Sequence, residues 1–293
     1  MGPHGWEVTA EATGAVIARF RRTRMALYHP PRVTSFAAAL ELCAAAAYDA
    51  PSEGVLGFQV PVSCEGSSSM AGQMVSFPSN GGTAEGYLAT PASGEGPGVI
   101  VLQEWWGLND NIKGIADRFA AEGYLALAPD LYHGKVVAEP DDAAKVMMAM
   151  KMDEAARDMS GAYDYLKNSG ACTGKVGSVG FCLGGGLSLY VSTLKPIDAT
   201  VIYYGALPGV QPDLSKLSGP VLGHYAEHDD WASPEAAAAL AKQLQDAGKS
   251  VEFHQYAGTG HGFFNDTRPE VHNVAASQQT WERTIAFYKK HLA

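Results

Sequence analysis

The sequence has 293 residues, of which 46% are hydrophobic and 18% charged, and it carries a formal net charge of -10. This composition provides enough apolar side chains for a folded core. The negative charge argues against nucleic acid or an anionic membrane surface as a partner, because both require clustered Lys and Arg. No uninterrupted run of about 18 apolar residues occurs, so the sequence predicts no membrane-spanning helix.

Residues 1–72 differ in composition from the rest of the chain. They contain five Arg and no Lys, whereas residues 73–293 contain twelve Lys and four Arg. The basic cluster at 21–24 and the Ala-rich stretch at 35–47 have elements of a signal peptide. However, the cluster begins about twenty residues into the chain and Glu41 interrupts the apolar stretch. We therefore predict an N-terminal extension over 1–72, poorly ordered or outside the core, and a folded domain over 73–293.

From residue 74 onward, the apolar patterns of strands and helices alternate. Short β-branched or apolar runs predict strands at 86–90, 98–103, 125–128, 175–179, 199–204, 220–225 and 251–256. Helical spacing of apolar residues predicts helices at 111–121, 141–150, 153–166, 183–191, 234–247 and 274–291. This alternation is typical of a single doubly wound α/β domain, in which helices cover both faces of a mostly parallel sheet.

A glycine-rich run, Gly180–Gly185, places a cysteine between a predicted strand and a predicted helix. Its Gly-x-Cys-x-Gly pattern has the form of a nucleophile elbow, the sharp turn that exposes a catalytic side chain above a sheet. The turn requires residues without Cβ on both sides, because the nucleophile itself has strained backbone angles. Cys182 is therefore the candidate nucleophile, and a buried structural cysteine is the alternative.

Two further loops at the same edge of the predicted sheet carry an acid and a base. Asp229 follows the strand at 220–225, and His261 lies in a glycine-rich loop after the strand at 251–256. Nucleophile, acid and base follow one another in this order in α/β-hydrolases, where the base activates the nucleophile and the acid orients the base. Asp230 is the alternative acid.

The remaining histidines and cysteines do not predict a metal site or a disulfide framework. His224 and His228 lie four residues apart at a strand end, which is more typical of a hydrogen-bonded loop than of metal ligands. The four cysteines are too sparse for a disulfide scaffold and form no Cys-x-x-Cys pair, which favours a reducing compartment where a free thiol persists. We expect a cytoplasmic protein without a metal or other cofactor.

Five segments of the sequence resemble the dienelactone hydrolase family, the α/β-hydrolases with a cysteine nucleophile. They are, in chain order, Gln103–Gly107, Ala128–Tyr132, Gly180–Gly185, Gly223–Asp229 and Gly260–His261. The resemblance covers residues 74–293 and implies an α/β-hydrolase fold with a Cys182–His261–Asp229 triad. It also implies that Glu104 contacts the resting thiol and helps to activate it when substrate arrives.

An oxyanion hole requires backbone N–H donors directed at the charge that develops on the substrate carbonyl. Leu183 directly follows Cys182 and opens the predicted helix, so its N–H is one expected donor. The resemblance implies, by position in the motif, that Trp105 supplies the other.

The sequence departs from the family at the residues that hold a carboxylate-bearing lactone. The founding enzymes have an arginine four residues after the catalytic histidine, where this sequence has Asn265. They have another in the helical region before the elbow, where no Arg occurs between Arg118 and Arg157. Three lysines are possible substitutes without the bidentate fork of arginine: Lys135, Lys145 and Lys151.

The side chains beside the catalytic loops favour an apolar pocket. The candidates to line it are Trp106, Trp231, Phe263, Phe264 and Asn265. Because an unpaired charge in a cleft costs several kcal/mol, we predict that neutral aryl or short acyl esters and neutral lactones are better substrates than carboxylate-bearing dienelactones.

Together these features predict a hydrolase that cleaves carboxylic esters or lactones through a thioester on Cys182. Its partner is a small-molecule substrate, and we expect a monomer or dimer. One alternative is a thiol redox or sensing protein that uses Cys182 with Cys172; it is weak, because Cys172 precedes the elbow strand and so lies at the opposite edge of the sheet. Another is a binding module that has the hydrolase fold without catalysis, which the complete triad disfavours.

Overall fold

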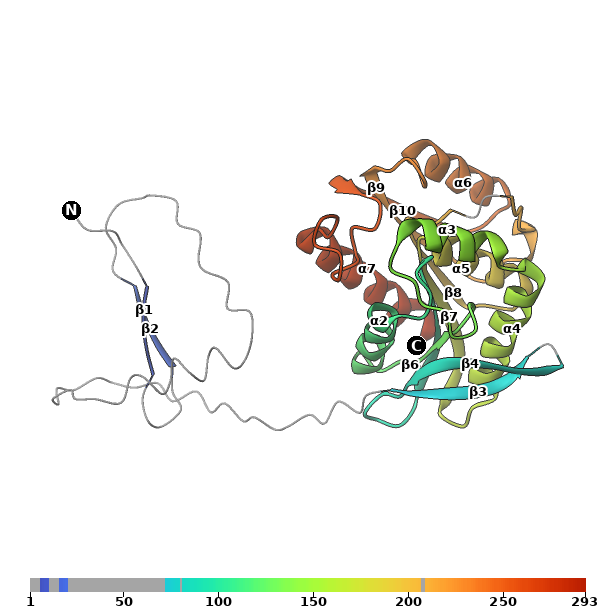
Figure 1. Ribbon diagram of the computed structural model, residues 1–293, viewed down its shortest axis with the longest axis horizontal. Coiled ribbons are helices and arrows are strands. Elements are labelled where there is room, and N and C mark those ends of the chain that lie inside the picture. The colour runs from blue at the N-terminus through green and yellow to red at the C-terminus, as the bar shows by residue number, and fades with distance from the viewer. Residues whose placement is uncertain (1–5, 11–15, 21–71, 80, 207–208) are drawn as a thin grey trace. The chain divides into compact units, whose positions relative to one another are not determined.

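The computed structural model describes residues 6–10, 16–20, 72–79, 81–206 and 209–293 (Figure 1). The chain forms two compact units, residues 1–67 and 68–293. In the first unit, β1 (Trp6–Ala10) and β2 (Val16–Phe20) form an antiparallel pair. The sequence does not predict these strands, because five residues each are too few for their alternation to be recognised. The assignment of residues 1–72 to an extension stays a prediction.

The second unit is built on one eight-stranded sheet with the strand order β10-β9-β8-β7-β5-β6-β4-β3. In chain order the strands are β3 (Gln73–Ser79), β4 (Gly82–Ala89), β5 (Gly96–Leu102), β6 (Leu125–Pro129), β7 (Cys172–Phe181), β8 (Ala199–Tyr203), β9 (Val221–His228) and β10 (Val251–Gly260). β3 pairs antiparallel with β4, and β4 with β6, while the other neighbours are parallel. The predicted mostly parallel sheet is confirmed.

Several strands differ from the sequence prediction. β4, β7 and β9 extend beyond their predicted ranges, and the differences at β3 and β10 are described here. The prediction lacks β3, whose polar sequence contains Pro78 and buries only Phe77 and Ser79. β3 is an edge strand, a position that tolerates proline and polar side chains. β10 continues to Gly260 instead of ending at Tyr256, with a register irregularity between these two residues. The longer strand brings His261 directly to the edge of the sheet.

Helices cover this sheet in the part of the chain that the structure describes. They are α2 (Asp110–Ala121), α3 (Pro140–Ala149), α4 (Met152–Asn168), α5 (Leu183–Leu194), α6 (Pro234–Asp246) and α7 (Val274–Leu292), with a 3₁₀ turn at Leu214–Lys216. α2 and α7 pack together through Phe119 and Trp281, whose ring centroids lie 4.6 Å apart. Within the described ranges, none of the helices has both the length and the apolar character that crossing a bilayer requires.

β7 shows how the helices divide between the two faces of the sheet. A Cβ atom on Gly177 would meet Tyr288 and Leu292 of α7. The Ser178 hydroxyl instead lies 2.8 Å from that of Ser188 on α5. Successive strand residues point to opposite faces, so α7 and α5 cover opposite faces, as Figure 1 shows. The carboxyl ends of the parallel strands are left free at one edge, where sites form in such sheets.

Candidate active site

Cys182 lies in a strained turn between β7 and α5. Its backbone has φ 55° and ψ -119°, a conformation that costs a non-glycine residue of order 1–3 kcal/mol. A Cβ on Gly180 would lie 1.8 Å from the Gly184 carbonyl oxygen, and one on Gly184 would lie 2.4 Å from the Leu102 carbonyl oxygen. Both glycines are therefore required by close backbone approach, which accounts for the sequence pattern of the elbow.

Asp229 and His261 meet at the same edge of the sheet. Asp229 directly follows β9, and its Oδ2 atom lies 2.8 Å from Nδ1 of His261, which directly follows β10. The other carboxylate oxygen of Asp229 accepts hydrogen bonds from the N–H groups of Trp231 and Ala232, each at 2.8 Å. Asp230, the alternative acid, is exposed. The geometry thus pairs the imidazole with Asp229.

The charges around His261 favour its protonated form. Burial alone would lower the pKa of the imidazole, but hydrogen bonds to Asp229 and Cys182 outweigh burial and raise the pKa to about 10. Burial raises the pKa of Asp229, and its hydrogen bonds to His261 and to two backbone N–H groups lower it by more. At neutral pH the pair is therefore an imidazolium and a carboxylate.

Glu104 lies two residues after β5 and is buried. Its Oε2 atom accepts a hydrogen bond from the Asn265 amide at 2.8 Å, and its Oε1 atom accepts one from the Tyr204 hydroxyl at 3.2 Å. Burial raises the pKa of the Glu104 carboxyl, although both hydrogen bonds oppose this rise. Asn265 is thus a neutral partner of this carboxyl.

Tyr204 belongs to this site and was missed by the sequence analysis. It follows β8 with φ 38°, and its ring lies edge-on to the His261 imidazole at a centroid distance of 5.1 Å. The predicted strand at 199–204 ended on this residue, so its position at the carboxyl edge was the available signal. A tyrosine that ends a strand next to the elbow strand can reach both the base and the buried acid.

The two expected oxyanion donors are the backbone N–H groups of Leu183 and Trp105. Leu183 is the first residue of α5, so its N–H has no acceptor within the helix. Trp105 directly follows Glu104 and is half-buried. Among the described residues neither N–H has a hydrogen-bond acceptor, so both remain available to a ligand.

The other aromatic pocket candidates have different surroundings. Trp106 is buried and packs on Trp105 at a centroid distance of 5.0 Å, whereas Trp231 is 42% exposed. Phe263 and Phe264 are buried in the core, where they pack on Tyr204 and Phe181 respectively. The structure therefore gives Phe263 and Phe264 a packing role, and the lining of a substrate pocket by these residues stays a prediction.

His224 is a buried member of a polar network. Its Nδ1 atom lies 2.8 Å from the Tyr256 hydroxyl, and its Nε2 atom lies 3.1 Å from the Thr284 hydroxyl. Burial holds the pKa of His224 well below its ordinary range. Across the described ranges, no three His, Cys, Asp or Glu side chains gather in a way that would hold a metal ion.

The eight-stranded mixed sheet, the strained elbow, and an acid and a base on the next loops define an α/β-hydrolase. Comparison with known proteins identifies the group more closely, because the Dienelactone hydrolase family matches residues 84–292. The chain belongs to this family, which confirms the resemblance of the five sequence segments, and it is a hydrolase.

Relatives and solved structures agree with this assignment. The chain is 41% identical to "Protein usf" of Aquifex pyrophilus, over 75% of this chain and 99% of the relative. It is 36% identical to a protein of Aquifex aeolicus named "Putative carboxymethylenebutenolidase", over the same shares of the two chains. The crystal structure titled as a putative dienelactone hydrolase from Klebsiella pneumoniae superposes with a TM-score of 0.69 at 26% identity, over 75% of this chain and 98% of that chain. The expected α/β-hydrolase fold is confirmed.

Proposed function

We propose that the protein hydrolyses carboxylic esters or lactones through a thioester on Cys182, with His261 as the base and Asp229 as the residue that orients it. The observation that carries this proposal is the 2.8 Å pair of Asp229 and His261 beside a cysteine at φ 55°. A positioned base and a strained, glycine-flanked nucleophile are the requirements of nucleophilic catalysis.

The reaction proceeds in two halves. In the first, the Cys182 thiolate attacks the substrate carbonyl, and the N–H groups of Leu183 and Trp105 stabilise the resulting oxyanion. The intermediate collapses to a thioester, and the leaving alkoxide takes the proton of the His261 imidazolium. In the second half, neutral His261 takes a proton from water as the water attacks the thioester. The acid leaves, and the thiolate and imidazolium are restored.

Glu104 is the proposed activating residue for the thiol. Its carboxyl is buried and lies within electrostatic reach of His261. Protonation or deprotonation of this carboxyl therefore changes the stability of the imidazolium that pairs with Cys182. Tyr204 and Asn265 position the carboxyl through one oxygen each.

The proposed substrates are neutral esters and neutral lactones. The relative from Aquifex aeolicus is named "Putative carboxymethylenebutenolidase", which supports the lactone class, although the lactone in that name carries a carboxylate. In this chain Asn265 is neutral and already donates to Glu104, so it supplies no charge for a substrate carboxylate. The proposal includes a cytoplasmic location, since the reaction requires a free thiol.

A redox pair of Cys172 and Cys182 is disfavoured as an alternative. Cys172 is the first residue of β7, and Cys182 directly follows its last residue. A strand of ten residues spans roughly 30 Å, far beyond the reach of a disulfide. The two thiols therefore act separately.

Ester hydrolysis by matched cysteine variants tests the proposal. Cys182→Ala should lose at least about a thousandfold in kcat on an aryl ester, because the covalent route is removed. Cys172→Ala is the control and should keep the wild-type rate. Iodoacetamide should inactivate the wild type but not a sample saturated with substrate. Full activity of Cys182→Ala in a folded protein would end the thioester proposal.

A further inference from the structure

The loop that follows His261 holds one buried amide in a single orientation. Asn265 is 2% exposed, and its Oδ1 atom accepts a hydrogen bond from the Thr267 N–H at 3.1 Å and another from the Thr267 hydroxyl at 2.7 Å. A backbone N–H only donates, so the amide atom that faces it is the carbonyl oxygen. Thr267 thereby determines which way the side-chain amide of Asn265 is turned.

The NH2 group of the same amide faces Glu104. It donates to Oε2 of the carboxyl at 2.8 Å, and the Tyr204 hydroxyl donates to Oε1 at 3.2 Å. An amide rotated by half a turn would present its carbonyl oxygen instead, and this acceptor would favour a protonated carboxyl. In the observed orientation both partners of Glu104 donate, which favours the carboxylate form.

Tyr204 connects Glu104 with the proposed base. Its hydroxyl contacts the carboxyl, and its ring lies edge-on to the His261 imidazole at a centroid distance of 5.1 Å. The ionisable groups that act on the carboxyl are Tyr204, His261 and Arg268. Burial raises the pKa of Glu104, while its hydrogen bonds and the positive charges of His261 and Arg268 lower it. Because these effects oppose one another, the charge of Glu104 is sensitive to the direction of a single hydrogen bond.

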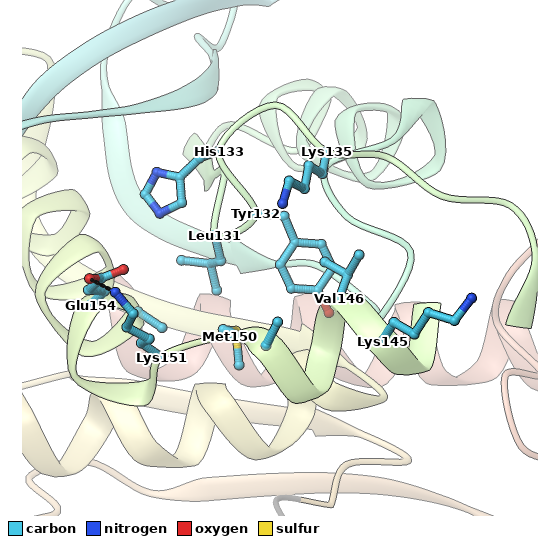
Figure 2. Close-up of a pocket in the computed structure, with 11 residues that line it drawn as sticks. Leu131, Tyr132, His133, Lys135, Lys145, Val146, Met150, Lys151 and Glu154 are labelled. Atoms are coloured by element: carbon cyan, nitrogen blue, oxygen red, sulfur yellow. Dashed lines mark hydrogen bonds and ion pairs between the residues drawn. The ribbon is translucent and has the colours of Figure 1, made fainter. Parts of the chain in front are cut away.

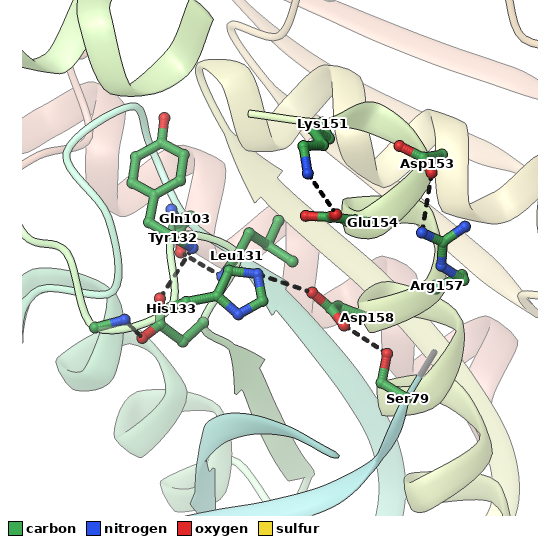
Figure 3. A network of polar contacts seen from close by, with 12 residues as sticks. Ser79, Gln103, Leu131, Tyr132, His133, Lys151, Asp153, Glu154, Arg157 and Asp158 are labelled. Carbon is green, nitrogen blue, oxygen red and sulfur yellow. Dashed lines mark hydrogen bonds and ion pairs between the residues drawn. The ribbon is translucent and has the colours of Figure 1, made fainter. Parts of the chain in front are cut away.

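The chain is anchored on both sides of the contact between Glu104 and Asn265. Gln103, the residue before Glu104, accepts a hydrogen bond from the Leu131 N–H at 3.2 Å, a contact that Figure 3 shows. On the other side, the Asn265 N–H donates to the Gly262 carbonyl oxygen at 2.9 Å. With both segments held in this way, the direction of the amide is the main remaining freedom of the contact.

We propose that Thr267 is a positioning residue: its two donors keep the NH2 group of Asn265 directed at Glu104 and so hold the carboxyl as an anion beside the base His261. The anion stabilises the imidazolium, which supplies the proton to the leaving alkoxide. This inference rests on the proposed ester hydrolysis and adds the residue that sets the charge of Glu104. Thr267 acts through Asn265 and takes no part in the chemistry itself.

Titration of the Glu104 carboxyl measures the effect of Thr267 directly. In protein made with isotope-labelled glutamate, the carbon NMR signal that disappears in Glu104→Gln reports the protonation of this carboxyl. Thr267→Val keeps the branched shape of the side chain but removes the hydroxyl donor, so the amide turns more readily and the pKa of Glu104 should rise by about half a unit. Thr267→Ser keeps the hydroxyl and should titrate as the wild type does. Thr267 is exposed, so neither change disturbs the core.

Asn265→Asp should shift the same titration further. The new side chain has the same shape and still accepts from Thr267, but an oxygen replaces the NH2 group opposite Glu104. Two carboxyls then face each other, so one apparent pKa of the pair should rise by about two units. An unchanged titration in Thr267→Val would overturn the role of Thr267, whatever the effect of Asn265→Asp.

The pH dependence of ester hydrolysis separates positioning from a purely structural role. In Thr267→Val, kcat/KM for phenyl acetate should reach the wild-type value at high pH, where Glu104 is an anion in both proteins. The acid limb of the profile should move to higher pH by the amount that the NMR titration shows, and Thr267→Ser should restore the wild-type profile. A uniform fall in kcat/KM at every pH would indicate a structural effect and overturn the proposal.

Glu154→Gln is the control for loss of a carboxylate outside this site. Glu154 pairs with Lys151 at 2.9 Å beside a separate cavity of about 350 Å³, shown in Figure 2, whose described lining contains no residue of the proposed triad. This variant should leave the titration of Glu104 and the pH profile unchanged. An acid limb that stays in place in Thr267→Val despite a shifted titration would overturn the link to His261. If the wild type hydrolyses no ester, the proposed function has failed, while the NMR titration still decides the role of Thr267.

Discussion

The two ends of β7 place two free cysteines in opposite surroundings. Cys172, at the first residue, is partly exposed, and its sulfur contacts only the nearby Lys175 carbonyl oxygen at 3.7 Å among the described residues. Cys182, just past the last residue, is 7% exposed, has φ 55° and lies beside His261. The same residue type is thus an ordinary thiol at one end and a candidate nucleophile at the other. Neighbours at the carboxyl edge make the difference.

Removing the imidazole of His261 should abolish the difference in reactivity between Cys182 and Cys172. In His261→Ala, kcat for ester hydrolysis should fall by about a thousandfold or more, because Cys182 loses its base. Alkylation by iodoacetamide, followed by peptide mass spectrometry, should then modify Cys182 no faster than Cys172. A variant that still alkylates preferentially at Cys182 would show that another group activates the thiol.

Replacing Asp229 should lower the reactivity of Cys182 less than removing His261 does. Asp229→Asn should lower kcat by about a hundredfold, because the amide cannot stabilise the imidazolium and favours the wrong tautomer. Asp230→Asn should stay within about twofold of the wild type, since Asp230 is exposed. A larger loss in Asp230→Asn than in Asp229→Asn would show that Asp230 orients the base in solution.

The charge of the substrate tests whether the site at the carboxyl edge of the sheet accepts an anion. A neutral aryl ester should have a kcat/KM about tenfold higher than a carboxylate-bearing dienelactone, because the substrate carboxylate would be buried without a paired cation. Both are measured on one preparation. A preference for the anionic lactone would mean that a lysine such as Lys135 or Lys145 supplies the missing charge.

The pH dependence of the free energy of unfolding tests the protonation state of His261 beside Cys182. The pKa of His261 is about 10 in the folded protein and about 6.5 in an unfolded chain, so proton binding stabilises the fold. This contribution is complete below about pH 6.5 and is lost as the pH rises to about 10. Urea unfolding should therefore show a larger stability difference between the wild type and His261→Gln at pH 6 than at pH 10. A difference independent of pH would contradict the raised pKa.

The smallest effect is expected from the N-terminal unit. A chain beginning at Met74 should fold and keep the kcat of the full-length protein, because the eight-stranded sheet begins at β3 and contains every proposed catalytic residue. Circular dichroism and ester turnover check this outcome. An insoluble or inactive product would mean that residues 1–72 stabilise the catalytic domain.

The sequence was sufficient to predict the elements that follow from local pattern and chain order. Cys182, Asp229 and His261 each follow a recognisable strand, so their meeting at one edge of the sheet could be inferred. The Glu104–Asn265 hydrogen bond joins residues 161 positions apart and depends on the directions of two side chains. Similarly, the buried hydroxyl of Tyr132 makes no hydrogen bond among the described residues, and this depends on what surrounds it, which no pattern of apolar spacing records.

The order of the proposed triad along the chain has a consequence for biosynthesis. Cys182 follows β7, whereas His261 follows β10, the last strand of the sheet. A ribosome adds about 5–20 residues per second, so the histidine is synthesised roughly 4–16 seconds after the cysteine. During this interval the Cys182 thiol of the nascent chain lacks the His261 imidazole, and the carboxyl edge of the sheet is incomplete. Its reactivity is then that of an ordinary cysteine. If Cys182 is the nucleophile as proposed, reactive acyl compounds in the cell meet an activated thiol only after the last strand has joined the sheet.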